Sequence, residues 1–264
     1  MRNILFYLLV LLSYLSYGQT KDSIPIFEYE IRYSLGKALV KKGYVFKKEN
    51  KIHFNTTKSV FLEKIKKFTE NNDEGMPEIN IVEGVVNENI ITDLNKNKLF
   101  KLCNLKGKSI LTEEVLKINQ WKPTGVKKEI SNRNCIELEG NFRGRDYIAY
   151  VDLEIPFYFG PWKLNNFPGL LVEVSDTKKQ LSWKLLSIKN VSKSKINGFI
   201  KKQEDFFSSL KTISLKEFVP LHDLTKYNIF SYSTSRLPRD YKKRKSTKKK
   251  RRTGLELVYE WEEK

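Results

Sequence analysis

The alternation of apolar and polar residues along much of the chain is the feature that most constrains its fold. In residues 24–33, the side chains of Phe27, Tyr29 and Ile31 alternate with Ile26 and two glutamates. Successive side chains of a β-strand point to opposite faces, so a period of two indicates a strand with one buried face. Comparable segments occupy residues 79–86, 89–94, 98–102, 115–121, 134–139, 146–155, 170–174 and 180–188.

This succession of strands predicts a mainly β (α+β) fold built as an antiparallel meander. A sheet of this extent tends to curl so that its edges are protected. We therefore expect a large curved antiparallel sheet, open or a half-barrel, around one or two short helices, with a β-sandwich as the alternative. Helical spacing occurs at residues 60–68 and 203–210. Ser214 and Glu217 form a capping box, and Pro220 is expected to interrupt the helix that they start.

The N-terminus has the three parts of a secretory signal peptide. Arg2 supplies the positive charge, residues 4–12 are apolar, and small residues end the segment at Gly18. The apolar run is shorter than the roughly 20 residues of a membrane-spanning helix, and no cysteine follows it as a lipid-anchored protein would require. We expect cleavage before Gln19, a single β-rich domain over residues 19–264, and a location in the periplasm, on the outer-membrane surface or outside the cell.

Two cysteines, Cys103 and Cys135, leave two alternatives open. An oxidising compartment permits a disulfide, which would stabilise the fold by about 3 kcal/mol in the loop-entropy model. Both residues also have apolar neighbours, Leu102 and Ile136, which suit two buried free thiols equally well. The spacing along the chain does not choose between these states.

Residues 154–171 hold the most distinctive motif. Gly144-Arg145 precedes it, and it contains Glu154-Ile155-Pro156, Gly160-Pro161-Trp162 and Asn166-Phe167-Pro168-Gly169-Leu170-Leu171. These four elements, in this order, resemble the GLPGLI family, a secreted group from Bacteroidetes-type bacteria with no assigned activity. The resemblance implies residence in the cell envelope or outside the cell, and a closing strand at residues 255–257. It implies no substrate and no reaction.

The motif has a physical interpretation that is independent of the family. Pro156, Pro161 and Pro168 fix φ and remove backbone donors, so the segment does not belong in a central strand. Asn166 stands where the family has glycine, and asparagine is well suited to a positive φ. Pro168 and Gly169 predict a type II turn.

Two roles for the motif follow from its aromatic residues. It is either a packed corner between two strands or a groove that presents Trp162 and Phe167 to a ligand or partner. The leading functional hypothesis is therefore a non-enzymatic, exported protein that binds a ligand or a partner of the envelope.

Catalytic chemistry has little support in the sequence. His53 and His222 are isolated, and neither a HExxH nor a CxxC pattern occurs. The sequence thus points to no catalytic residue, no metal ligand and no cofactor. A hydrolase that uses Glu154 and Glu173 beside the motif is one alternative function.

A basic segment at residues 236–253 supplies a further alternative. The chain has a net charge of +18, and nine basic residues lie between positions 242 and 252, including Lys243, Arg244, Lys249 and Arg251. Such a run repels itself and predicts an extended, mobile loop. It could also attract an anionic surface polymer, mainly through non-specific charge.

Overall fold

The computed structural model describes residues 22–35, 38–56, 88–234, 252 and 254–262. The predicted signal peptide, the predicted helix at 60–68, the predicted strand at 79–86 and most of the basic segment, with Lys243, Arg244, Lys249 and Arg251, lie outside these residues. Among the described residues, no helix is long and apolar enough to cross a membrane.

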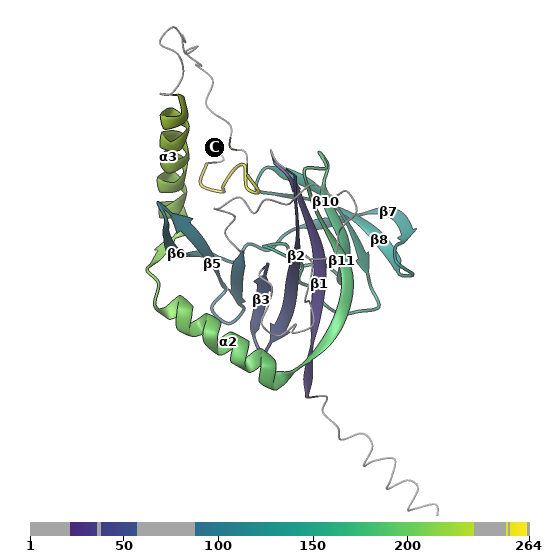
Figure 1. The fold of residues 1–264 in the computed structure, drawn as a ribbon. Coiled ribbons are helices and arrows are strands. Elements are labelled where there is room, and N and C mark those ends of the chain that lie inside the picture. The colour runs from purple at the N-terminus through teal and green to yellow at the C-terminus, as the bar shows by residue number, and fades with distance from the viewer. Residues whose placement is uncertain (1–21, 36–37, 57–87, 235–251, 253, 263–264) are drawn as a thin grey trace, which may run out of the picture.

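Within the described residues, twelve strands form one sheet, and two helices flank it (Figure 1). The strands are β1 (Ser23–Ser34), β2 (Ala38–Lys48), β3 (Lys51–Asn55), β4 (Asn89–Asp93), β5 (Lys98–Leu105), β6 (Lys108–Val115), β7 (Trp121–Glu129), β8 (Asn134–Phe142), β9 (Arg145–Asp152), β10 (Leu170–Asp176), β11 (Leu181–Ser192) and β12 (Thr212–Ser214). The helices are α2 (Lys193–Ser208) and α3 (Leu215–Thr234). The prediction of a mainly β protein with a large open sheet is confirmed.

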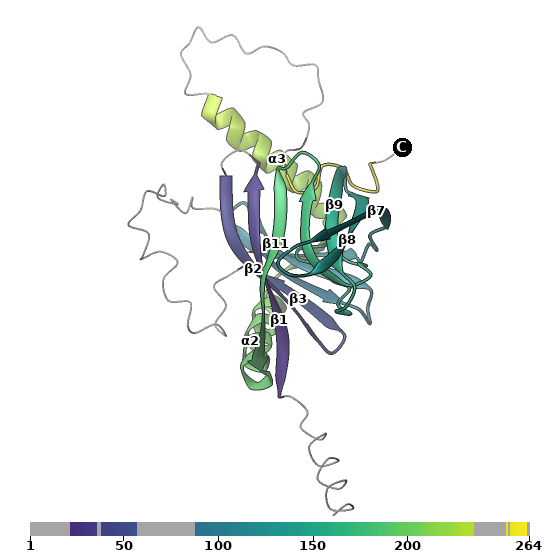
Figure 2. The ribbon, with the colours of Figure 1, turned by 90° about the vertical axis from the view of Figure 1, so that its right-hand side faces the viewer.

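The strand order is β12-β6-β5-β4-β3-β2-β1-β11-β10-β9-β8-β7, so two meanders meet where β1 pairs with β11. The first meander runs outward from β1 to β6, and the second starts at the opposite edge with β7 and returns to β11. Figure 2 shows the long strands curving past the β7–β8 ribbon. All strand pairs are antiparallel except β12 with β6, which are parallel. The sheet is therefore mixed, and the expectation of a purely antiparallel sheet is wrong in this respect.

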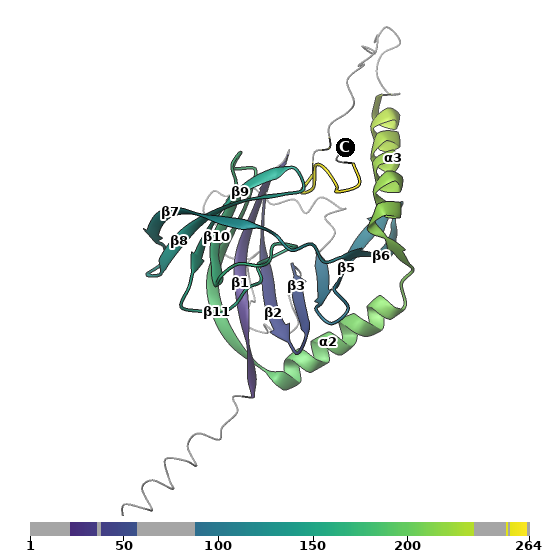
Figure 3. The same ribbon diagram turned by 180° about the vertical axis from the view of Figure 1, so that it is seen from behind.

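The connection between β6 and β7 joins strands that lie near opposite ends of the sheet order. Residues 116–120 make this connection over one face, which can be followed in Figure 3. The prediction of a strand at residues 115–121 is therefore wrong. In this crossing segment (residues 116–120), Leu116 packs into the inner apolar cluster, whereas Ile118 is 53% exposed.

The two faces of the sheet carry different cores. The inner face, defined by Phe27, Tyr29 and Ile31 of β1, holds the largest apolar cluster, which also includes residues of the motif. The outer face carries Ile26 and Phe46, against which α2 packs. A helix was expected within the curve of the sheet, yet the motif and not α2 packs against the centre of the inner face.

Helix α2 begins ten residues before the predicted segment at 203–210. Its buried residues Ile196, Ile200, Gln203 and Phe207 recur at helical spacing and form one stripe. Gln203 is the polar member of that stripe. Its Oε1 lies 2.9 Å from Nδ1 of His53, and its Nε2 donates to Asn55 Oδ1 at 2.9 Å.

Helix α3 starts at the predicted capping box. The backbone N–H of Ser214 donates to Glu217 Oε2 at 3.0 Å, and the N–H of Glu217 donates to Ser214 Oγ at 3.2 Å. Pro220 lies inside the helix, which continues to Thr234, so the predicted interruption is wrong. Proline removes the single N–H that would bond four residues back, and the rest of the helical ladder remains.

Both cysteines are free thiols in the structure. Cys103 on β5 packs beside Ile110 and the start of α3, whereas Cys135 on β8 is buried with Ile130 and Val172. The two residues belong to separate apolar clusters on different strands. Of the two alternatives, the structure has the free thiols.

Candidate functional site

The motif forms the long loop between β9 and β10, which folds back over the inner face of the sheet. Only an isolated bridge between Phe159 and Asn165 interrupts its irregular backbone. The prediction that its prolines keep it out of a central strand is confirmed. Pro161 is buried, while Pro156 and Pro168 lie at the surface.

Trp162 is a core residue. Its side chain is 3% exposed, and its ring stacks on that of Trp183, with centroids 6.0 Å apart and planes at 10°. Phe142 meets it edge-on at 5.5 Å. The packed-corner interpretation therefore holds for Trp162, and its predicted role as an exposed binding residue is wrong.

Phe167 combines both predicted roles. It is 2% exposed and belongs to the inner core, and its ring stacks on Trp121 at 4.6 Å. Part of the same residue lines a surface groove. It thus supports the floor of that groove without projecting from it.

The backbone of the motif explains its unusual residues. Asn166 has a φ of 61°, as predicted for a residue that replaces glycine, and Trp162 has the same φ. The predicted type II turn is wrong, because Gly169 is absent from the positive-φ residues. Glycine is required there for another reason: a Cβ at this position would collide with the carbonyl oxygen of Asp152.

A set of asparagine side chains joins the motif to the crossing segment. The backbone N–H of Asn165 donates to Asn119 Oδ1 at 2.8 Å, and the N–H of Asn119 donates to Asn165 Oδ1 at 3.2 Å. Asn166 Nδ2 donates to the carbonyl of Asn119 at 2.9 Å, and Trp121 Nε1 donates to that of Asn165 at 2.8 Å. These hydrogen bonds hold two irregular segments side by side. No local sequence pattern predicts these bonds.

Beneath the motif lies a buried charge cluster, defined here as Glu114, Arg143, Lys163 and Glu256. Lys163 pairs with Glu114 and, at 2.8 Å, with Glu256. Arg143 pairs with Glu256 and, at 2.5 Å, with Glu114. Burial raises the pKa of Glu256, but Lys163 and Arg143 outweigh it and bring that pKa to about 2. The cluster fastens the C-terminal residues 254–262 to the inner face.

Arg145 belongs to a second buried ion pair. Its Nη1 lies 2.7 Å from Oδ2 of Asp176 at the end of β10. Its Nε donates to the carbonyl of Leu255 at 3.1 Å. Gly144 has a φ of 80°, and a Cβ at this position would lie only 3.1 Å from Cγ2 of Val258. The absence of a side chain at Gly144 therefore lets Val258 pack against its backbone. The C-terminal residues are held in this way without forming the predicted closing strand at 255–257.

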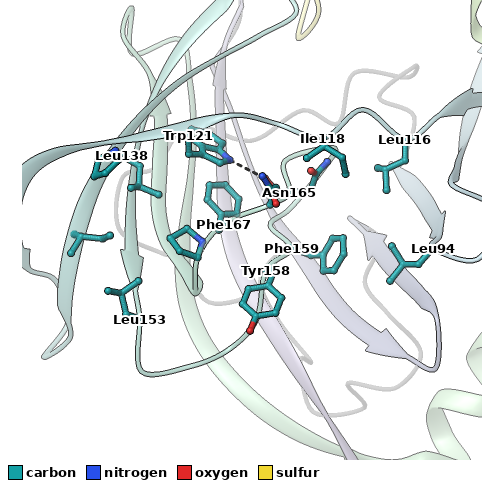
Figure 4. A pocket seen from close by; sticks show the side chains of 14 residues that line it. Leu94, Leu116, Ile118, Trp121, Leu138, Leu153, Tyr158, Phe159, Asn165 and Phe167 are labelled. Atoms are coloured by element: carbon teal, nitrogen blue, oxygen red, sulfur yellow. Dashed lines mark hydrogen bonds between the residues drawn. The ribbon is translucent and has the colours of Figure 1, made fainter.

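An open groove of about 700 Å³ lies between the crossing segment, the β7–β8 ribbon and the motif (Figure 4). Its lining consists of Leu94, Leu116, Ile118, Trp121, Pro123, Ile136, Leu138, Leu153, Tyr158, Phe159, Asn165, Asn166, Phe167 and Pro168. Ile118, Leu153 and Tyr158 are 53%, 51% and 50% exposed. Exposed apolar side chains that gather around a concavity mark a binding surface more often than scattered ones do.

The carboxylates of the hydrolase alternative are not part of this groove. Glu154 is exposed on the loop and its side chain does not line the groove. Glu173 pairs across strands with Tyr150 and Lys184, on the face opposite to Leu138. The structure therefore does not bring these two carboxylates together on the groove wall.

The histidines lie apart from the groove as well. His53 is fully buried and stacks on Phe46 at 4.8 Å, and His222 stacks on Phe218 at 5.1 Å. Within the part of the chain that the structure describes, no group of three histidine, cysteine or acidic side chains could hold a metal ion. Arg252, at the end of the basic segment, pairs with Asp223 at 2.8 Å.

Comparisons with known proteins leave the function open. No family model matches the chain, and no curated protein matches it. Two solved structures of a protein named PNGF-II, in two crystal forms, match with TM-scores of 0.47 and identities of 13% and 12%. Each match covers 75% of this chain, which spans 32% and 33% of the length of those chains. The GLPGLI resemblance stays a prediction.

Proposed function

We propose that this protein is a non-enzymatic, exported binding protein that holds a small apolar ligand in the groove of Figure 4. The observation that carries the proposal is the open groove lined almost entirely by apolar and aromatic side chains. Its volume of about 700 Å³ falls within the roughly 300–1,000 Å³ of small-molecule sites.

The construction of the groove supports a pre-formed site. Its walls come from two irregular segments that the asparagine bonds hold together, and its floor includes the stacked rings of Trp121 and Phe167. Leaving Ile118 and Leu153 half exposed to water has a free-energy cost, which an apolar ligand would recover on binding.

The size of the groove argues for a small molecule over a protein surface. A stable protein–protein interface buries about 800 Å² on each partner, whereas this concavity has the dimensions of a single small ligand. An apolar ligand without charge in its inserted part also suits the lining, since none of the lining residues is charged.

The first experiment titrates the purified protein with N-phenyl-1-naphthylamine, an uncharged apolar fluorophore. We expect saturable binding that Leu153→Asp weakens at least about tenfold, because the substitution places a charge on an apolar wall. The matched control is Leu186→Asp, at a similarly exposed leucine that does not line the groove, and it should bind as the unchanged protein does. Equal loss in both variants, or no saturable binding, would contradict the proposal.

Export and family membership are part of the same proposal. They rest on the charged start, the apolar run of residues 4–12 and the four ordered elements that end at Leu171. Protein recovered from the native cell envelope or medium should begin at Gln19 when its N-terminus is sequenced. An intact Met1 in that material would contradict export by a cleaved signal peptide.

A further inference from the structure

The groove has an uncharged interior with few polar atoms. Asn165, Asn166 and Tyr158 supply its polar side chains. The Asn165 amide is already occupied, because its Nδ2 donates to the carbonyls of Lys117 and Lys163 and its Oδ1 accepts from Asn119. The inserted part of a ligand is therefore apolar, since a charge buried there would lack a partner.

A cation stands immediately beyond one end of this lining. In the β7–β8 ribbon, Pro123 pairs with Leu138 and Lys127 pairs with Ile136. Pro123, Leu138 and Ile136 all line the groove. Directly opposed residues of an antiparallel pair share a face, with Cβ atoms about 5 Å apart. Lys127 is thus the next residue of β7, beyond the bulge, on the groove face.

The side chain of Lys127 is accessible to a ligand in solution. Its side chain is exposed, and no other described residue forms an ion pair or hydrogen bond with it. Glu129 shares its face but lies opposite Asn134, one pair further from the lining. An anion at the groove mouth would therefore meet Lys127 before it met Glu129.

The other lysines of β7 lie on the opposite face. Lys122 pairs with Glu139 and Lys128 pairs with Cys135, both one position out of phase with the groove residues. The Lys128 ammonium lies 5.0 Å from the ring centroid of Tyr150 on that face. Within β7, Lys127 is the cation on the groove side.

We propose that the ligand is an anionic amphiphile, such as a fatty acid, whose chain lies in the groove and whose carboxylate or similar head group binds Lys127. This proposal rests on the proposed function and adds the class of ligand. The complementarity is between an uncharged concavity and a lysine at its mouth, on a chain with a net charge of +18 that favours encounters with anions.

The experiment compares decanoate with 1-decanol at pH 8, each below its aggregation limit, as competitors of bound N-phenyl-1-naphthylamine. The two probes share a ten-carbon chain and differ in the charge of the head group. We expect the protein to bind decanoate several-fold more tightly than decanol, in line with the modest strength of exposed ion pairs. Added salt should reduce that preference.

Charge reversal at Lys127 gives the decisive comparison. Lys127→Glu should weaken decanoate binding about tenfold and leave decanol binding within about twofold, because only the charged head is repelled. The matched control Lys122→Glu makes the same change on the other face of the same strand and should alter neither probe. Circular dichroism of both variants checks that the fold is unchanged.

The outcomes separate the two proposals. If decanol binds and Leu153→Asp prevents it, but Lys127→Glu leaves decanoate unaffected, the groove stands and the head-group assignment is overturned. Equal weakening by Lys127→Glu and Lys122→Glu also overturns it, since the attraction then comes from overall charge. If neither probe binds the unchanged protein, the proposed function itself fails.

Discussion

Acidification is expected to destabilise this protein through one buried histidine. His53 lies between the sheet and α2, where its Nδ1 faces Gln203 Oε1 at 2.9 Å. Because Gln203 Nε2 donates to Asn55, the histidine must donate from Nδ1, which leaves Nε2 unprotonated in the neutral ring. Nε2 is buried and has no hydrogen-bond partner among the described residues. A proton added there would create a charge without an acceptor.

The sign and size of the effect follow from the pKa. Burial lowers the pKa of His53 from 6.5 to about 4, and nearby Lys51 acts in the same direction, while Gln203 and Glu204 oppose it. The unfolded chain therefore takes up the proton first. The full contribution to stability is present above pH 6.5 and is lost as the pH falls toward 4, to a total of about 3 kcal/mol.

The assay is urea denaturation at a series of pH values from 7.5 to 4. This range starts about one pH unit above the unfolded pKa of 6.5 and ends at the folded pKa of about 4. We expect the free energy of unfolding to fall more steeply for the unchanged protein than for His53→Phe, which retains an aromatic ring against Phe46 but does not titrate. His222→Phe is the matched control and should follow the unchanged protein. Parallel curves for the unchanged protein and His53→Phe would refute the argument.

Three further predictions concern the core. Trp162→Ala should lower the free energy of unfolding by about 3 kcal/mol or more, as for other buried aromatic residues. The control Trp261→Ala, at a more exposed tryptophan, should lower it less. Equal small losses for the two variants in urea denaturation would contradict the core assignment of Trp162. Glu256→Gln should cost about 3 kcal/mol because it leaves Arg143 and Lys163 underpaired in a buried site, and a loss no larger than that of the half-exposed Glu260→Gln would argue against the cluster. Two thiols should react with a maleimide reagent in the denatured, unreduced protein; none reacting would show a disulfide.

Much of the sheet could be predicted because its information is local. The alternation around Phe27, Tyr29 and Ile31 reflects one buried face, and these residues do lie together on the inner face. The positive φ of Asn166 and the capping box of Ser214 also depend on one residue or one turn, and both predictions are confirmed.

The failed predictions have a common origin in tertiary contacts. Residues 115–121 have the composition of a strand, but the order of the sheet makes residues 116–120 a crossing segment. The need for glycine at position 169 comes from the carbonyl of Asp152, and not from the turn that Pro168-Gly169 suggested. The ion pair of Arg145 with Asp176 joins residues 31 positions apart, and no local pattern specifies it.

The candidate site was only partly visible in the sequence. The motif drew attention to Phe167, which does line the groove, and to Trp162, which does not. Leu94, Ile118 and Leu153 showed no signal of their own, because a single apolar residue looks the same in a core and in a groove.

By itself, the sequence determined seven of the strands, their buried faces and the irregular backbone of the motif, since period-two alternation and proline act over a few neighbouring residues. The strands that it missed are β2, β3, β6, β7 and β12. Only the tertiary structure decided which segments meet. The groove unites residues from Leu94 to Pro168, and the charge cluster joins Arg143 to Glu256 across 113 positions. Such contacts depend on where the sheet brings distant segments, so no local pattern specifies them.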